Sequence, residues 1–166
     1  MAQKGYCSAL TRGYCGVREH LIATPNGLFY FVLQLPGNRH DVNGLYALLE
    51  TSFQGHLLSD NAFWPHRKMR PLLEQRGITI TAATRRGTHF VHPPDIAQMI
   101  HRNRKNLDRL IGLFNQQFHA DRTRCRSPKH YMARRWFKVL AHNISRHINA
   151  KQCLPFESVG HFNLAA

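Results

Sequence analysis

The stretch EHLIATPNGLFYFVLQL, residues 19–35, carries the clearest structural signal in the chain. Two runs rich in β-branched and aromatic residues, 19–24 and 28–35, flank Pro-Asn-Gly at residues 25–27. Runs of this composition predict strands, and the short Pro-Asn-Gly segment between them predicts a tight turn. We therefore expect an antiparallel β-hairpin at this point.

The segment after the hairpin predicts alternating helices and strands. Apolar residues spaced for one helix face, short apolar runs and turn residues give the order helix 42–52, strand 55–59, helix 65–76 and strand 78–83. Asp60 directly follows the apolar run GHLLS, so its carboxylate is expected at the C-terminal end of a buried strand. Gly77 is the expected C-cap of the helix before it.

The second half of the chain predicts helices. Residues 85–94 contain Gly and two prolines without periodicity and are expected to form a loop. Helices are expected from Asp95 to about Phe118, with Asp95 as an acid at the N-terminus, and from Pro128 to about Asn149, with Ser127 as N-cap. The expected core stripe of the second helix consists of Tyr131, Trp136, Val139, Leu140 and Ile144. Residues 151–166 are expected to be a loose tail.

Composition favours one globular domain with a polyanionic partner. The 166 residues are 43% hydrophobic, and 23 Lys and Arg against 9 Asp and Glu give a formal charge of +14. Such an excess repels itself unless a polyanion neutralises it, which disfavours an enzyme for small neutral substrates. No apolar run reaches the roughly 20 residues that span a bilayer, and no secretory signal is evident, so we expect a soluble, cytoplasmic protein. The four cysteines are too dispersed for a metal knuckle and are expected to be reduced.

The basic residues concentrate in residues 65–151, which hold 19 of the 23 Lys and Arg. Cations next to aromatic and apolar residues on expected helices are typical of proteins that bind a phosphate backbone. The alternative is a solvated basic surface with no partner. The expected DNA contacts are Arg102, Arg104, Lys105, Arg122, Arg124, Arg126, Lys129, Arg134, Arg135 and Lys138.

Several segments, in order, resemble the DDE transposases of bacterial insertion sequences. The matching segments are 4–9 (KGYCSA), 35–41 (LPGNRHD), 57–63 (LLSDNAF), 107–109 (LDR), 122–127 (RTRCRS) and 134–145 (RRWFKVLAHNIS). The resemblance implies a ribonuclease-H-like α/β fold with a mixed sheet in residues 1–84, long helices in 95–149, and a single domain over residues 1–150. It also implies DNA cleavage and strand transfer in a bacterial, nucleoid-associated setting.

The resemblance further implies a site for two Mg²⁺ or Mn²⁺ ions held by three carboxylates. Asp60 matches the second acidic position, and Asp108 stands at the third, where the family usually has Glu. Mg²⁺ prefers oxygen ligands and bridges phosphate oxygens, and two such ions can activate a nucleophile and stabilise the departing oxygen. Asp60 and Asp108 are therefore the expected catalytic and metal-binding residues.

Each of these candidate site residues has a plainer interpretation. Asp60 can cap the turn that follows it, and Asp108 can pair with Arg104 or Lys105 on the helix surface. The segment His40-Asp41 is expected to order the turn into a helix and to have no catalytic role. His89 and His92 are expected to be surface residues, because no Cys or acidic partner lies near them in sequence.

The first catalytic Asp of the family lies on a strand that precedes the block matched here by residues 4–9. We therefore expect a truncated ribonuclease-H-like domain that lacks the first central strand and is inactive in strand transfer. Two alternatives remain open. One is a non-catalytic nucleic-acid-binding protein or regulator derived from a transposase, and the other is a protein that pairs with a complementary fragment through an exposed sheet edge. A homodimer is also possible, and no membrane partner is expected.

Overall fold

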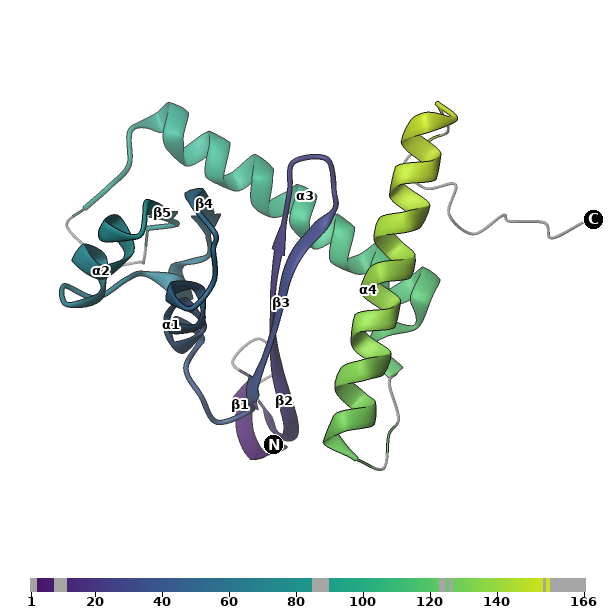
Figure 1. The fold of residues 1–166 in the computed structure, drawn as a ribbon. Helices are drawn as coiled ribbons and strands as arrows, with labels where there is room; N and C mark the ends of the chain where they lie inside the picture. The colour runs from purple at the N-terminus through teal and green to yellow at the C-terminus, as the bar shows by residue number, and fades with distance from the viewer. Residues whose placement is uncertain are drawn as a thin grey trace, which may run out of the picture. The chain divides into compact units, whose positions relative to one another are not determined.

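The structure is a computed structural model that describes residues 3–7, 12–84, 90–122, 125, 127–153 and 155. It is a mixed α/β protein whose elements are labelled in Figure 1. The chain divides into two compact units. One contains Leu21–Gln34 and Leu107–Ala166, and the other contains Ala2–His20 and Leu35–Asn106. No helix in the described ranges is long and apolar enough to cross a lipid bilayer.

The hairpin expected from the sequence is present and belongs to a three-stranded sheet. Strand β2 (Arg12–Ala23) lies between β1 (Gln3–Cys7) and β3 (Phe29–Pro36). At the hairpin turn the Thr24 N–H donates to the Leu28 carbonyl at 2.8 Å. Gly27 has a φ of 77°, a left-handed conformation that glycine adopts without strain. The prediction of a hairpin is confirmed, whereas β1, which pairs antiparallel with β2, was not expected.

The second sheet is a parallel pair. Strand β4 (Gly55–Ser59) pairs with β5 (Ile78–Ala82) in the register Gly55 to Ile78, and both strands were expected. Gly77, with a φ of 70°, turns the chain into β5, and its carbonyl accepts from the Gly55 N–H at 2.9 Å. The described residues thus form two separate sheets. The single mixed sheet implied by the transposase resemblance is not confirmed.

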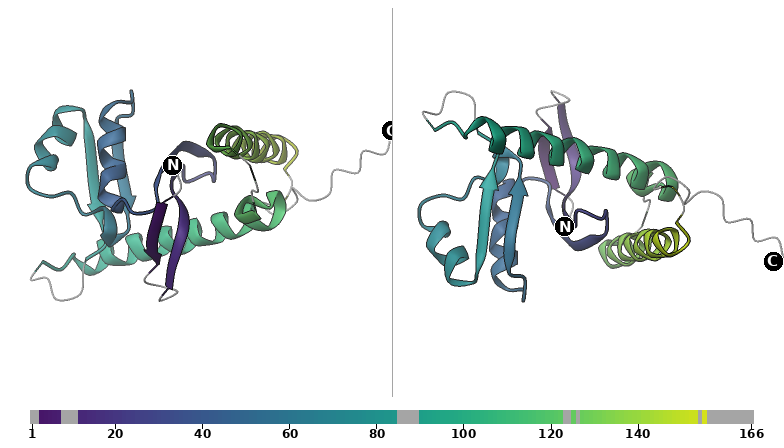
Figure 2. Two further views of the ribbon diagram at one scale, coloured as in Figure 1. Left: turned by 90° about the horizontal axis from the view of Figure 1, so that it is seen from below. Right: turned by 90° about the horizontal axis from the view of Figure 1, so that it is seen from above.

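Two short helices flank the parallel pair. Helix α1 (Gly44–Leu49), preceded by a 3-10 turn at Asp41–Asn43, runs beside the strands in both views of Figure 2. Helix α2 (Met69–Gln75) begins four residues later than expected, because residues before it form a turn in which the Met69 N–H donates to the His66 carbonyl. The most deeply buried side chains of this unit are Leu45, Leu48, Met69, Leu73, Ile78 and Ala82.

The two long helices match their expected bounds closely. Helix α3 spans Pro94–Phe118, with Asp95 in its first turn, and α4 spans Pro128–Lys151. Ser127 caps α4, because its hydroxyl accepts from the His130 N–H at 3.3 Å. The core that joins the C-terminal part of α3 to the hairpin and α4 consists of Phe29, Val32, Leu110, Phe114, Ala120 and Val139.

The expected core stripe of α4 is largely wrong. Val139 is buried, but Trp136, Leu140 and Ile144 are about half exposed, at 48%, 54% and 50%. The buried face of α4 carries polar side chains instead, with Arg135, His142 and Asn149 among its buried residues. The reason is that α4 packs against backbone groups of the hairpin, which require hydrogen-bonding partners.

Asn143 makes the central contact between α4 and the hairpin, which lie side by side in Figure 1. Its Oδ1 accepts from the Phe29 N–H, and its Nδ2 donates to the Phe29 carbonyl, both at 2.9 Å. The next side chains extend the contact toward the turn, since His142 Nε2 donates to the Gly27 carbonyl and Arg146 to the Asn26 carbonyl. The polar face of α4 therefore satisfies the backbone of Phe29, the first residue of β3, and two carbonyls of the turn.

His142 is enclosed by aromatic rings. The side chain is 1% exposed, and its ring centroid lies 4.8 Å from that of Phe29 and 5.6 Å from that of Phe114. Burial lowers the pKa of His142, the hydrogen bond to the Gly27 carbonyl opposes this, and Arg146 adds to the lowering. The folded protein therefore favours the neutral imidazole.

Removing the Asn143 side chain is expected to destabilise the protein. Asn143→Ala leaves both the N–H and the carbonyl of Phe29 without their partner, which should lower the free energy of unfolding by about 1–3 kcal/mol. The control is Asn103→Ala, because Asn103 only bonds the Met99 carbonyl within its own helix. Urea unfolding of the two variants provides the measurement, and equal losses would contradict the special role of Asn143.

Acid is expected to destabilise the protein through His142. Because the folded pKa lies below the usual value of 6.5, the unfolded chain binds more protons in this range. Stability should therefore fall as the pH drops below 6.5 toward the folded pKa. His142→Gln should flatten the slope of unfolding free energy against pH between pH 7.5 and 5, while His147→Gln, at an exposed position, serves as control. Some slope should remain, since burial also lowers the pKa of His20.

Candidate nucleic-acid interface

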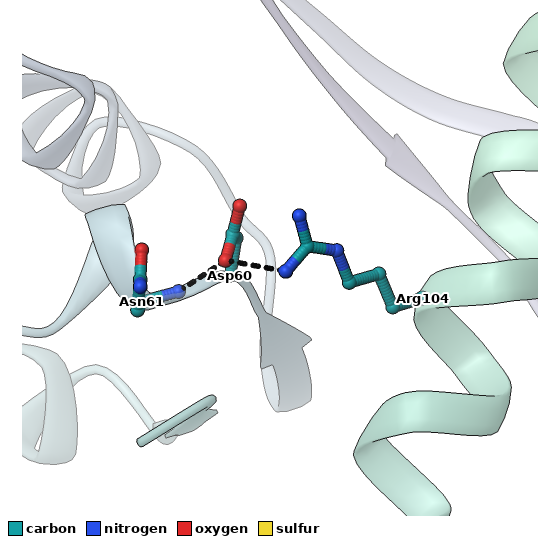
Figure 3. A network of polar contacts seen from close by, with 3 residues as sticks. All are labelled: Asp60, Asn61 and Arg104. Atoms are coloured by element: carbon teal, nitrogen blue, oxygen red, sulfur yellow. Dashed lines mark hydrogen bonds and ion pairs between the residues drawn. The ribbon is translucent and has the colours of Figure 1, made fainter. Parts of the chain in front are cut away.

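Asp60 stands where the sequence placed it, directly after β4 at the C-terminal end of the parallel pair. Its Oδ1 accepts from the Asn61 N–H at 2.7 Å and so caps the 3-10 turn Asn61–Phe63. The same oxygen accepts from Arg104 Nη1 of α3 at 3.2 Å, as Figure 3 shows. The plainer interpretation of Asp60, a residue that caps the following turn, is therefore confirmed.

The ion pair between Asp60 and Arg104 is solvent-accessible. The two side chains are 41% and 55% exposed. Water screens such a pair, so its contribution to stability lies at about 0–1 kcal/mol. The pair matters for the surface charge instead. Arg104 is an expected DNA contact, and the carboxylate of Asp60 neutralises its positive charge. Asp60 Oδ2 makes no hydrogen bond within the described part of the chain.

Asp108, the second expected metal ligand, is exposed on α3 one turn after Arg104. Asp60 and Asp108 belong to different units of the chain. Across the described residues, no group of three or more His, Cys, Asp or Glu side chains is placed to hold a metal ion. Two Mg²⁺ ions need several converging oxygen ligands. The two-ion site implied by the resemblance therefore stays a prediction.

The exposed cations of α3 share one face of the helix. Arg102, Lys105 and Arg109 follow one another at spacings of three and four residues, which places them on adjacent turns of the same face. All three side chains are exposed. They span eight residues, and the first and last lie about 10 Å apart along the helix axis. We call Arg102, Lys105 and Arg109 the cationic face of α3.

Arg109 was missed among the expected DNA contacts, although the sequence held a signal for it. The expected contacts Arg102, Arg104 and Lys105 belong to the basic run HRNRK at residues 101–105, and Arg109 lies four residues beyond its end. The helical spacing from Arg102 and Lys105 would have included it. By contrast, the ion pair of Arg104 with Asp60 has no signal in the local pattern, because 44 residues separate the two.

The cations expected on and before α4 have different environments. Arg135 is 4% exposed, donates to the Ala120 carbonyl and lies over the Phe114 ring, so it is a core residue. Lys138 donates to the His119 carbonyl at 2.6 Å, and burial, followed by the charge of Arg135, lowers its pKa. Lys129 and Arg134 are exposed. The side chain of Arg122 and the whole of Arg124 and Arg126 lie outside the described residues.

Other candidate residues have structural roles. Asp41 forms an ion pair with Arg18 at 2.9 Å and stands in the first turn of the 3-10 segment, consistent with the expected ordering of that turn. His92 is partly buried, and its Nε2 lies 2.8 Å from the Ala82 carbonyl, while His89 lies outside the described residues. The cysteines whose state the structure describes, Cys15, Cys125 and Cys153, are free thiols.

Comparison with known proteins identifies no relative of this chain. No protein-family model matches the chain, no curated protein is similar to it, and no solved structure resembles it. The resemblance to insertion-sequence transposases stays a prediction from the quoted segments. The function must be argued from the charges and contacts described above.

Proposed function

We propose that this chain binds nucleic acid, with duplex DNA as the substrate, through the cationic face of α3. The observation that carries the proposal is the alignment of Arg102, Lys105 and Arg109 on one exposed helix face. Duplex DNA carries one negative charge per roughly 1.7 Å of its axis, so a row of cations on a straight helix meets several phosphates.

The distribution of acids supports binding at this face. The whole chain carries 9 acids against 23 Lys and Arg. Asp41 and Asp60 are paired internally with Arg18 and Arg104. Of the acids on α3, Asp95 lies in the first turn, and only Asp108 lies beside the cationic face. Phosphate oxygens would therefore replace counterions around Arg102, Lys105 and Arg109.

In its finer form, the proposal assigns the chain to the transposase type. The ordered segments from residues 4–9 to 134–145 support a ribonuclease-H-like arrangement and DNA ends of an insertion sequence as the target. Within this proposal the chain itself contributes backbone binding rather than cleavage, because the described residues provide no complete carboxylate cluster. A regulator that occupies the DNA ends of an intact transposase would likewise need to bind the DNA backbone without cleaving it.

A second candidate function is metal-dependent phosphodiester cleavage centred on Asp60. Two observations favour it: the carboxylate stands at the C-terminal end of a parallel strand pair, and Oδ2 has no hydrogen bond within the described part of the chain. Further carboxylates would have to come from another chain or segment. The two candidates differ in what Asp60 does, which makes Asp60 the residue to test.

The dependence of binding on salt tests the cationic face. Because each neutralised phosphate adds about −0.9 to the slope of log affinity against log salt, Arg102→Gln with Lys105→Gln should reduce the magnitude of the slope by about 1.8. The control is Arg67→Gln with Lys68→Gln, an equal loss of charge at exposed positions before α2. Fluorescence anisotropy with a labelled duplex gives the slopes. A flat profile for the unmodified chain, or equal reductions in both variants, contradicts the proposal.

Asp60→Asn separates binding from cleavage. Asn also caps turns well, so the substitution removes the charge and releases Arg104 while the turn is retained. We expect DNA affinity to stay unchanged or rise slightly, and no Mg²⁺-dependent nicking of a supercoiled plasmid by either protein. Asp95→Asn, in the first turn of α3, is the control for loss of one negative charge. Nicking by the unmodified chain that Asp60→Asn abolishes would favour the second candidate instead.

A further inference from the structure

The outward face of α4 carries a continuous apolar row. Met132, Trp136, Leu140 and Ile144 follow one another at intervals of four residues and are 37%, 48%, 54% and 50% exposed. Phe137 lies next to this row and is 70% exposed. We call these five residues the apolar ridge of α4. Single exposed apolar residues are common, but a contiguous row on one helix marks an interaction surface.

The ridge is not part of the core of its own unit. An adjacent face of α4 makes the contacts with the hairpin through Asn143, His142 and Arg146. Turning α4 to bury the ridge would break these bonds and leave backbone groups of β3 and the turn unsatisfied. The ridge is thus held outward by the same bonds that dock the helix.

The geometry of the ridge fits a helical partner. Rows of side chains four residues apart are the ridges that pack into the grooves of another helix in the commonest class of helix packing. The row from Met132 to Ile144 is thirteen residues long, and its first and last residues lie about 18 Å apart along the helix axis. Large aromatic and aliphatic side chains at such spacing are the anchors by which one amphipathic helix binds another.

The charges around the ridge define the partner further. Helix α4 contains no Asp or Glu, and Lys129, Arg134 and Lys151 are exposed on it. A second copy of the chain, with a charge of +14, would bring these cations against their own equivalents. An acidic helix would neutralise them, and such complementarity also speeds association.

We propose that the apolar ridge of α4 is the docking surface for an acidic amphipathic helix of a partner protein. The partner helix places apolar side chains on Trp136, Phe137 and Leu140 and its carboxylates against the cations of α4. This interaction is separate from nucleic-acid binding, because the ridge and the cationic face of α3 lie on different helices. The two functions can therefore fail independently.

A synthetic peptide tests the proposal directly. The probe is a helical peptide with Leu residues spaced three and four apart on one face and Glu on the other, compared with a twin that carries Lys in place of Glu. Trp136 reports binding in the full chain with Trp64→Phe, since the protein has two tryptophans. We expect the Glu peptide to shift Trp136 emission to shorter wavelengths with saturation, and the Lys twin to have no effect.

Variants on the ridge provide the specificity control. Phe137→Ser, at a 70% exposed position, should weaken peptide binding at least about tenfold without unfolding the chain. Val91→Ser, at a 76% exposed position outside α4, should leave it unchanged. Both variants should retain the salt-dependent DNA binding of the unmodified chain, which separates failure of this proposal from failure of nucleic-acid binding.

Four outcomes would overturn the proposal. The first is equal binding of the Lys twin, and the second is Trp136 that is already shielded from acrylamide in the free chain. The third is a dimer in sedimentation that Phe137→Ser dissolves, which would identify a second copy as the occupant. The fourth is a Trp136 response to anionic lipid vesicles or single-stranded DNA but not to the Glu peptide, which would identify a membrane or a nucleic acid.

Discussion

The carboxamide of Asn143 is the contact on which the unit formed by the hairpin and α4 depends. Strand β3 presents an outer edge whose N–H and carbonyl groups no further strand pairs with in the described residues. A side-chain amide offers a donor and an acceptor in one plane, as a peptide group does. By bonding both backbone groups of Phe29, Asn143 takes the place of a neighbouring strand at that point and protects the edge.

This contact determines the orientation of α4 and, with it, the character of the exposed surface. Once Asn143, His142 and Arg146 face the hairpin, the apolar residues four apart must face outward. Helical periodicity in a sequence shows that two faces differ, but it does not show which of them is buried. The expected core stripe was therefore wrong for Trp136, Leu140 and Ile144 even though the helix itself was predicted within two residues at its C-terminal end. The polar cluster His142-Asn143, followed by Arg146, was the sequence signal for the buried face.

Local signals in the sequence predicted most helices, strands and turns. The contacts between elements that are distant in sequence could not be predicted in this way. The turn at residues 25–27, the strands β4 and β5 and the cap at Ser127 depend on neighbouring residues, so composition and spacing identified them. The partners of each element depend on residues far away. The position of Asp60 could be predicted because it depends on the neighbouring run GHLLS. Its ion pair with Arg104 could not be predicted, because Arg104 is distant in sequence. The same limit applies to how the strands divide into two sheets.

The excess of positive charge connects stability with function. With internal carboxylates at Asp41 and Asp60 already paired with arginines, little negative charge remains to offset the cations of α3 and α4. Repulsion among these cations opposes the compact state, and burial lowers the pKa of Lys138, which adds to the cost of its charged form. An anion that binds only the folded chain stabilises it by mass action. A phosphate backbone on α3 and an acidic helix on α4 would therefore each favour the same folded state, at separate surfaces and by the same relief of repulsion.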